Sequence, residues 1–171
     1  LDSAAVYFEK YVRKVVQALK DYVSLWCTIN EPNGYAVQGF IQGQFPPGKQ
    51  DIGTGFTVMV NLLRAHAAAY HAIHQLQSQA RVGISHYYRS LKPSKSWFLP
   101  DRWVTRLLGH LNTAFPNGAT DGVMRFLWMR QYIKEAKATQ DFLGIDYYTR
   151  DYVSFNLLRM KDLFNRRYFR E

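Results

Sequence analysis

The stretch that decides the fold reads VSLWCTINEPNG over residues 23–34. Its apolar part, residues 23–29, is short and lacks strict alternation, which is typical of a strand buried on both faces. The run ends in a polar pair, Asn30 and Glu31, because the following Pro32 cannot donate a ladder hydrogen bond. A side-chain amide and a carboxylate therefore follow a buried strand directly.

Two later runs have the same character, VGISHYY over residues 82–88 and FLGIDYY over residues 142–148. Each ends in polar or aromatic residues, as the first run does. Hydrophobic positions at helical spacing predict the intervening elements. We expect helices over residues 3–20, 54–79, 101–112 and from about 120 to 137, a break at 115–118, a long loop over 33–53 and an irregular basic tail after 150.

Strands that alternate with helices predict βαβ units and a parallel sheet. The carboxyl ends of such strands are where α/β proteins build their sites. We therefore predict an α/β fold, a segment of a (β/α)8 barrel that forms one partial domain over residues 1–171. A small doubly wound sheet is the alternative, although no glycine-rich phosphate-binding turn follows any of the strands.

The composition of the chain limits the classes of function that it can have. The chain has 22 Lys and Arg against 13 Asp and Glu, a net charge of +9, which raises a nucleic-acid-binding alternative. The basic residues are scattered along several segments, so nucleic acid is an unlikely partner. No apolar run reaches the roughly 18 residues of a membrane span, so we expect no membrane association. The single Cys27 argues against a multi-cysteine metal site and fits a cytoplasmic location.

Glu31 has the setting of a catalytic acid. A carboxyl group at the end of a buried strand is partly desolvated, and desolvation raises a carboxyl pKa toward the range that a general acid needs. Asn30 beside it can hydrogen-bond a ligand hydroxyl. The alternative is a loop glutamate that merely precedes a proline.

These residues lie within a recognisable block. WCTINEP over residues 26–32 resembles the W-x-T-x-N-E-P block of the family 1 glycoside hydrolases, the retaining β-glucosidases and β-galactosidases. Three further blocks resemble that family in the same order: G-Y, G and P-P-G within residues 34–48, LRAHA over residues 63–67, and DFLGIDYYTR over residues 141–150.

The resemblance implies a (β/α)8 barrel of which this chain supplies about strands four to six. It implies that Glu31 is the general acid/base, that Asn30 contacts the sugar 2-hydroxyl, and that Tyr148 orients the nucleophile. No cofactor and no metal are implied, and the substrate is a β-glycoside whose cleavage retains the anomeric configuration.

The chain also departs from the family pattern. Asp146 stands where the family has Asn, and Tyr87 falls about where many members place an active-site Asn, so both are expected to bind substrate and to affect sugar specificity. The T-E-N-G segment that carries the nucleophile is absent from this sequence, so the nucleophile is expected outside the chain. Two alternatives follow: a catalytically inactive fragment, or half of a split barrel that pairs with a complementary chain or self-associates through open strand edges.

Overall fold

The computed structural model describes residues 3–168, the side chains of residues 161 and 165 excepted. The elements follow in the order α1 (Ser3–Leu19), β1 (Leu25–Asn30), α2 (Pro32–Ala36), a π-helical turn η1 (Val37–Ile41), α3 (Ile52–Leu76), β2 (Arg81–Pro93), α4 (Leu99–Asp121), β3 (Val123–Phe126), β4 (Met129–Tyr132), a 3-10 turn η2 (Lys134–Ala136), β5 (Phe142–Phe155), a 3-10 turn η3 (Met160–Asp162) and β6 (Asn165–Tyr168).

The main sheet has the strand order β1-β2-β5-β6. β1, β2 and β5 are parallel, as the sequence predicts, and β6 runs antiparallel along the last four residues of β5. β2 and β5 approach closely at Gly83, where a Cβ atom would lie 2.2 Å from the carbonyl oxygen of Phe142. The predicted parallel sheet is confirmed, and the carboxyl ends of its three parallel strands lie at one edge.

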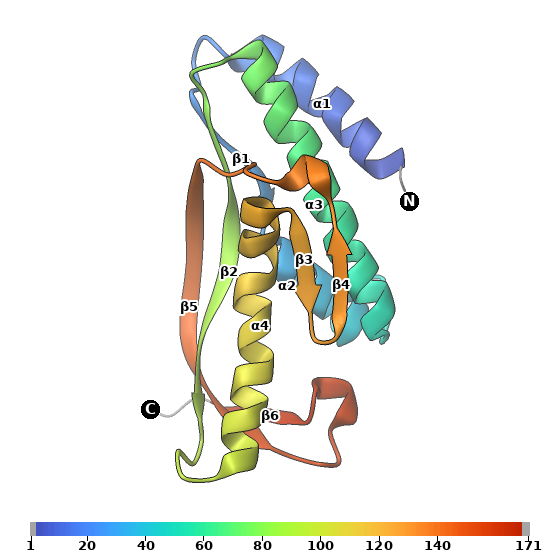
Figure 1. Ribbon diagram of the computed structural model, residues 1–171, viewed down its shortest axis with the longest axis vertical. Coiled ribbons are helices and arrows are strands. Elements are labelled where there is room, and N and C mark those ends of the chain that lie inside the picture. Colours follow the sequence, from blue (N-terminus) through green and yellow to red (C-terminus); the bar gives the residue numbers. More distant parts are fainter. Residues whose placement is uncertain (1–2, 169–171) are drawn as a thin grey trace.

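Helices cover one face of this sheet (Figure 1). The larger core lies between α3, α4 and the sheet, where Leu63, Phe115 and Ile84 are fully buried. A Cβ atom on Gly118 would lie 2.6 Å from Leu63, so this glycine lets α4 pack tightly on α3. α1 packs on α3 through a second cluster that includes Val12 and Val16. None of the helices within residues 3–168 has the length and apolar character needed to cross a bilayer.

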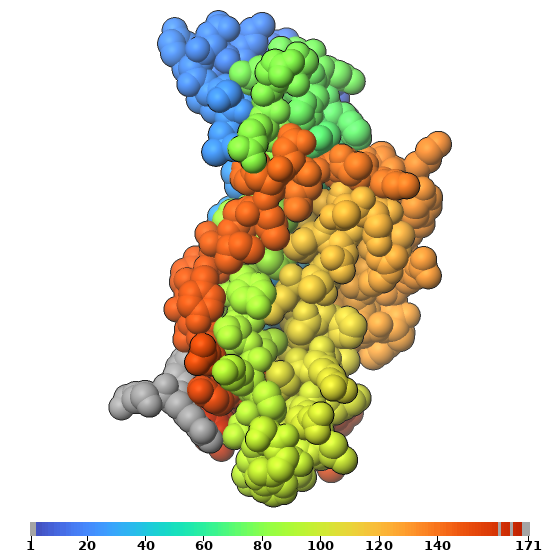
Figure 2. Space-filling view, turned by 60° about the vertical axis from the view of Figure 1, so that its left-hand side comes forward, coloured from blue at the N-terminus to red at the C-terminus, as the bar shows by residue number. Residues whose placement is uncertain are grey.

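The first half of β5 is left uncovered. In Figure 2 no helix covers β5, drawn in orange to red, over the part of its face in view. Its side chains are exposed on both faces, with Ile145 at 51% and Tyr148 at 67%. Only its last four residues, Tyr152–Phe155, pair with β6, so within residues 3–168 the edge of β5 before Tyr152 is open. The sheet is therefore unclosed at β5 as well as at β1.

The predicted helix break at residues 115–118 is wrong, because α4 continues through Pro116 to Asp121. A proline inside a helix costs about 3 kcal/mol because it lacks the N–H and clashes with the preceding turn. Its neighbours Ala114, Phe115 and Ala119 are buried in the main core, and their burial offsets a cost of that order. Tertiary packing therefore overrides the local proline signal.

The predicted helix over residues 120–137 is also wrong. Gly122 adopts a left-handed conformation with φ 78° that ends α4, and β3 and β4 then form a two-stranded antiparallel hairpin. Asp121, the last residue of α4, accepts a hydrogen bond of 2.8 Å from the backbone N–H of Val123. The apolar residues of this stretch fit helical and strand spacing equally, so periodicity alone misassigned it.

Two irregular regions are more ordered than the sequence predicts. The loop expected over residues 33–53 contains α2 and η1, and α3 begins already at Ile52, where Asp51 accepts a capping hydrogen bond from the N–H of Thr54. The tail expected to be irregular after residue 150 holds residues 151–155 of β5 and all of β6. Its residues 169–171 lie outside the described part of the chain.

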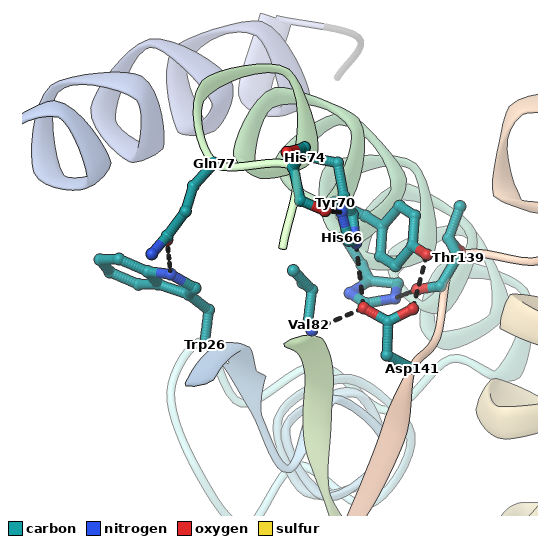
Figure 3. Close-up of polar contacts among 9 residues, drawn as sticks. Trp26, His66, Tyr70, His74, Gln77, Val82, Thr139 and Asp141 are labelled. Atoms are coloured by element: carbon teal, nitrogen blue, oxygen red, sulfur yellow. Dashed lines mark hydrogen bonds and ion pairs between the residues drawn. The ribbon is translucent and has the colours of Figure 1, made fainter. Parts of the chain in front are cut away.

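A polar network fastens α3 to the amino ends of the parallel strands (Figure 3). The Asp141 carboxylate accepts hydrogen bonds from the Tyr70 hydroxyl at 2.7 Å and from the Val82 N–H at 2.8 Å. His74 Nε2 lies 2.9 Å from the same carboxylate. Although partial burial acts in the opposite direction, these three partners lower the pKa of Asp141. Asp141 thereby links β2 and β5 to one face of α3.

His66 forms the buried part of this attachment (Figure 3). Its Nε2 lies 2.7 Å from the carbonyl oxygen of Thr139, and its Nδ1 lies 2.7 Å from the hydroxyl of Thr28. Because a carbonyl can only accept, Nε2 carries the proton and Nδ1 accepts from Thr28. His66 is therefore a packed histidine whose two ring nitrogens are both hydrogen-bonded.

The burial of His66 predicts an acid-sensitive fold. Burial lowers the pKa of His66 from 6.5 to about 4, so between these values the unfolded state binds more protons than the folded state. The free energy of unfolding must then fall as the pH falls through this window, by about 2 kcal/mol at pH 5. Urea unfolding of the complete enzyme at pH 7.5 and pH 5 measures this loss.

The matched variant is His66→Gln, which keeps an N–H donor for Thr139 but does not titrate. We expect it to be less stable than the parent protein at pH 7.5 and to lose less stability on acidification. Equal losses in parent and variant would show that His66 does not set the pH dependence.

Candidate active site

Glu31 occupies the carboxyl end of β1, immediately before α2. Its backbone N–H donates a hydrogen bond of 2.7 Å to the carbonyl oxygen of Ser85 in β2, and its carbonyl oxygen accepts one of 3.0 Å from Tyr35 in α2. These two bonds fix Glu31 between the sheet and the helix that follows it. The side-chain oxygen Oε1 is buried and has no hydrogen-bond partner among the described residues.

The backbone of Glu31 is strained. Its φ and ψ angles of 47° and 51° lie in the left-handed region, which a residue with a Cβ atom adopts at a cost of about 1–2 kcal/mol. Such conformations persist where the surrounding structure holds them in place, and they cluster at functional sites. A strained glutamate with a buried, unpartnered carboxylate oxygen is therefore the first sign of a catalytic group here.

Two tyrosines stand next to this carboxylate. The rings of Tyr87, from β2, and Tyr148, from β5, lie 5.4 Å apart. A hydrogen bond to the Glu31 carboxylate, with the negative charge of that carboxylate, raises the pKa of the Tyr148 hydroxyl. The structure therefore brings three residues that the sequence singled out into one group.

Asp146 and Asn30 complete the set at the same edge. Asp146 is the register partner of Tyr87, and it accepts a short hydrogen bond from the Ser85 hydroxyl. Asn30 is exposed and is the register partner of Ser85, beyond an irregularity in the β1–β2 ladder. Ser85 thus connects the residues from the other two strands, and the sequence reasoning missed it. Its position two residues before Tyr87 is the signal, since such residues share one face of a strand.

His86 lies elsewhere. It belongs to the polar and aromatic end of the run over residues 82–88, but strand alternation places it on the helix-covered face, where it is fully buried. Burial lowers its pKa. Asn33, also missed, is buried beside it and donates a hydrogen bond of 2.8 Å to the carbonyl oxygen of Tyr87. These two residues therefore pack beneath the site, on the helix-covered face of the sheet.

The arrangement suits proton transfer. Among residues 3–168, no three histidine, cysteine, aspartate or glutamate side chains come close enough to hold a metal ion. One strained carboxylate, a tyrosine hydroxyl and an exposed asparagine lie at the open carboxyl edge. This set of groups can protonate a bound oxygen atom and hydrogen-bond neighbouring hydroxyls.

Fold and site together define a class of protein. Three parallel strands with helices on one face and polar groups at their carboxyl ends are a segment of a (β/α)8 barrel enzyme. The family model for glycosyl hydrolase family 1 matches residues 2–164. The chain belongs to glycosyl hydrolase family 1.

The relatives are longer proteins. The 1,4-beta-D-glucan glucohydrolase of Thermotoga neapolitana is 27% identical over 166 residues, which cover 89% of this chain and 39% of the relative. The structure of a beta-glycosidase from Pyrococcus horikoshii superposes with a TM-score of 0.86 at 27% identity, and covers all of this chain but 39% of that one. The structure of a family 1 β-glucosidase from Thermotoga maritima superposes with a TM-score of 0.87 at 26% identity, and 41% of its chain is covered. This chain thus spans about two fifths of the length of these relatives.

The contact between Tyr148 and Glu31 predicts a coupled titration. Because the Glu31 charge raises the Tyr148 pKa, Glu31→Gln should lower that pKa toward the ordinary value near 10. The measurement is tyrosinate absorbance near 295 nm against pH. Subtracting the curve of the Tyr148→Phe variant, in each background, isolates Tyr148 from the other tyrosines.

The matched control is Glu135→Gln, which removes a charge from an exposed position outside the site. It should leave the Tyr148 curve unchanged. If Glu31→Gln also left the curve in place, the hydrogen bond between these two side chains would be disproved.

Proposed function

We propose that this chain carries the general acid/base of a retaining β-glycosidase. The observation that supports the proposal is Glu31, which is held in a strained conformation at the carboxyl end of β1 with one buried, unpartnered oxygen. Membership of glycosyl hydrolase family 1 supports the reaction class. The substrate is a β-glycoside, in keeping with the names of the relatives.

The reaction needs two carboxylates. In a retaining mechanism they lie about 5–5.5 Å apart, one as nucleophile and one as acid and then base. Glu31 protonates the leaving oxygen in the first step and deprotonates water in the second. Asp146 is already bound by the Ser85 hydroxyl and is a poor nucleophile, so the nucleophile comes from a segment outside this chain.

The neighbouring residues position the substrate and the acid. In this proposal the exposed Asn30 amide binds a sugar hydroxyl, and Tyr148 holds the Glu31 carboxylate through its hydroxyl. In the complete barrel Tyr148 also orients the nucleophile. Tyr87 and Asp146, which are register partners in the sheet, bind substrate and adjust sugar specificity. No metal or organic cofactor has a step in this mechanism.

Glu31→Gln in the complete enzyme tests the role of the acid. Without the proton donor, turnover of substrates with poor leaving groups should fall about 10² to 10⁴-fold, the usual worth of a general acid. Aryl glycosides with activated leaving groups should lose less in the first step, because their leaving group needs no proton. Added azide should restore part of the second step by replacing the activated water. Steady-state kinetics with cellobiose and a dinitrophenyl glucoside separate these effects.

Glu135→Gln again serves as the matched control and should retain parental activity on both substrates. The role assigned to Glu31 would be disproved by equal turnover of cellobiose in the Glu31→Gln variant and the parent enzyme.

The chain alone should be inactive and associated. β1 and the first half of β5 have open edges within residues 3–168, and the sheet exposes Leu25 and Ile145 at 57% and 51%. Such edges recruit further strands. We therefore expect the isolated 171 residues to self-associate, or to require a complementary chain, and to hydrolyse no glycoside because the nucleophile is missing.

Light scattering of the purified chain and an assay with an aryl β-glucoside test this expectation. Addition of a separately produced polypeptide that carries the remaining barrel strands should give a discrete complex, with activity that depends on Glu31. A cooperatively unfolding monomer with enzyme-like activity would contradict both parts. A cytoplasmic location stays a prediction.

A further inference from the structure

The first turn of α2 follows Glu31 directly and is bound to β2 by a side chain. Asn33, two residues after Glu31, is only 4% exposed. Its Nδ2 donates a hydrogen bond of 2.8 Å to the carbonyl oxygen of Tyr87 and one of 3.4 Å to the carbonyl oxygen of Leu111 in α4. Because carbonyl oxygens can only accept, the Asn33 side chain acts here through its N–H donors. One buried amide thus joins α2 to the sheet and to α4.

Asn33 supplies a hydrogen bond that β1 cannot make. β1 ends at Asn30, and the next residue, Glu31, still donates its backbone N–H to the carbonyl oxygen of Ser85 in β2. Tyr87 lies two residues further along β2, so strand alternation points its carbonyl oxygen toward the same edge. The chain has by then turned into α2, and the Asn33 amide takes the position of a backbone donor. The β1–β2 ladder therefore continues for one more bond past the end of β1.

The side chains of Glu31 and Tyr87 both come close to this turn. A Cβ atom on Gly34 would lie 3.5 Å from Oε2 of Glu31 and 3.6 Å from the Tyr87 ring. The carbonyl oxygen of Glu31 accepts a hydrogen bond of 3.0 Å from the N–H of Tyr35, so α2 begins on Glu31 itself. A shift of α2 along β2 would therefore move the Glu31 carboxylate relative to Tyr87 and Tyr148.

The strained backbone of Glu31 gives the Asn33 bond its importance. A left-handed conformation is unfavourable for a residue with a Cβ atom, so it persists only while the surrounding structure holds it. The backbone bonds to Ser85 and Tyr35 act at Glu31 itself. Pro32, the next residue, has no N–H to add. Asn33 therefore holds the start of α2 on the sheet, one residue beyond the proline.

We propose that Asn33 is a positioning residue for Glu31, because its amide fixes the turn that carries the general acid against the strand that carries Tyr87. Asn33 touches no substrate in this proposal and acts through Glu31. The inference rests on the proposed function, in which Glu31 is the acid.

The kinetic test uses the complete enzyme and two substrates, cellobiose and a dinitrophenyl glucoside. The leaving group of the first needs a proton and that of the second does not, so the ratio of their kcat/KM values reports the contribution of the acid. In Asn33→Ala the dinitrophenyl glucoside should gain about tenfold over cellobiose, because misplacement of a group by about 1 Å can cost about 100-fold. A purely structural loss lowers both values by the same factor and leaves the ratio unchanged.

Gln77→Ala is the matched control. Gln77 Nε2 donates to the carbonyl oxygens of Lys20 and Val23, at 2.9 Å each. Its Oε1 accepts from the indole N–H of Trp26, near the amino end of β1 (Figure 3). Gln77 is thus another side-chain amide that bridges two backbone carbonyls, but at the opposite ends of the strands from Glu31. Its loss should lower stability to urea and leave the kcat/KM ratio at the parental value, and an equal change of the ratio in Gln77→Ala would overturn the proposal.

A conservative variant covers the case in which Asn33→Ala does not fold. Asn33→Ser keeps a hydroxyl donor, but this donor is one bond closer to the backbone and reaches the Tyr87 carbonyl oxygen only if the turn shifts. The ratio in Asn33→Ser should therefore lie between the values of the parent enzyme and Asn33→Ala. A parental ratio in either variant, once it is folded, would contradict a positioning role.

Glu31→Gln, measured with the same two substrates, separates this inference from the proposed function. It should change the ratio by more than Asn33→Ala does. A ratio that changes in Glu31→Gln but not in Asn33→Ala would retain the proposed function and overturn the positioning role. An unchanged ratio in Glu31→Gln would instead remove the proposed function, and the position of the carboxylate is then decided by a measurement that needs no activity.

That measurement is the tyrosinate absorbance of Tyr148 against pH, isolated by subtraction of the Tyr148→Phe curve in each background. In Asn33→Ala the curve should shift toward that of Glu31→Gln, because the Glu31 carboxylate moves away from the Tyr148 hydroxyl. Gln77→Ala should keep the parental curve. A folded Asn33→Ala enzyme with the parental curve would show that Glu31 stays in place without the amide, and the proposal would fail.

Discussion

The site depends on the pairing of β2 between β1 and β5. That pairing is parallel on both sides, so the three strands end at one edge and place residues from three distant parts of the sequence together. It also requires a close approach, because a side chain on Gly83 would collide with the Phe142 carbonyl oxygen. At the opposite ends of the same strands, Asp141 accepts the Val82 N–H and two side chains of α3. Hydrogen bonds to α3 thus hold the amino ends of the strands, and the candidate site lies at their carboxyl ends.

The sequence predicted the elements whose signals are local and strong. The three parallel strands follow from apolar runs that end in polar residues, and α1, α3 and the first half of α4 follow from hydrophobic positions at helical spacing. The continuation of α4 to Asp121 and the β3–β4 hairpin did not follow, because the outcome there depends on partners distant in sequence. Pro116 stays helical since its neighbours are buried against α3, and Gly122 ends that helix in a conformation that periodicity does not encode. Ser85 and Asn33 were missed for a related reason. A serine and an asparagine carry no spacing signal until the sheet places them beside Asp146 and Tyr87.

The left-handed backbone conformation of Glu31 is held by the elements around it. A left-handed glutamate is unfavourable by itself, and three features hold it there: the N–H bond to Ser85, the bond from Tyr35 and the proline that begins α2. In this conformation the Glu31 carboxylate accepts a hydrogen bond from Tyr148. A glycine would adopt this backbone at lower cost, but it would supply no carboxyl group. The position therefore combines a backbone conformation that favours glycine with a residue that carries a carboxyl group.

Burial connects the open sheet to the surroundings of Glu31. One oxygen of its carboxylate is buried, whereas Tyr148 beside it is 67% exposed, so water reaches the other side of the pair. Within residues 3–168, β1 and the part of β5 before Tyr152 also have open edges. Strands that paired with those edges would cover the same side of the site. Closure of the sheet and exclusion of water from Glu31 are therefore one requirement, because both need surface that the described residues do not provide.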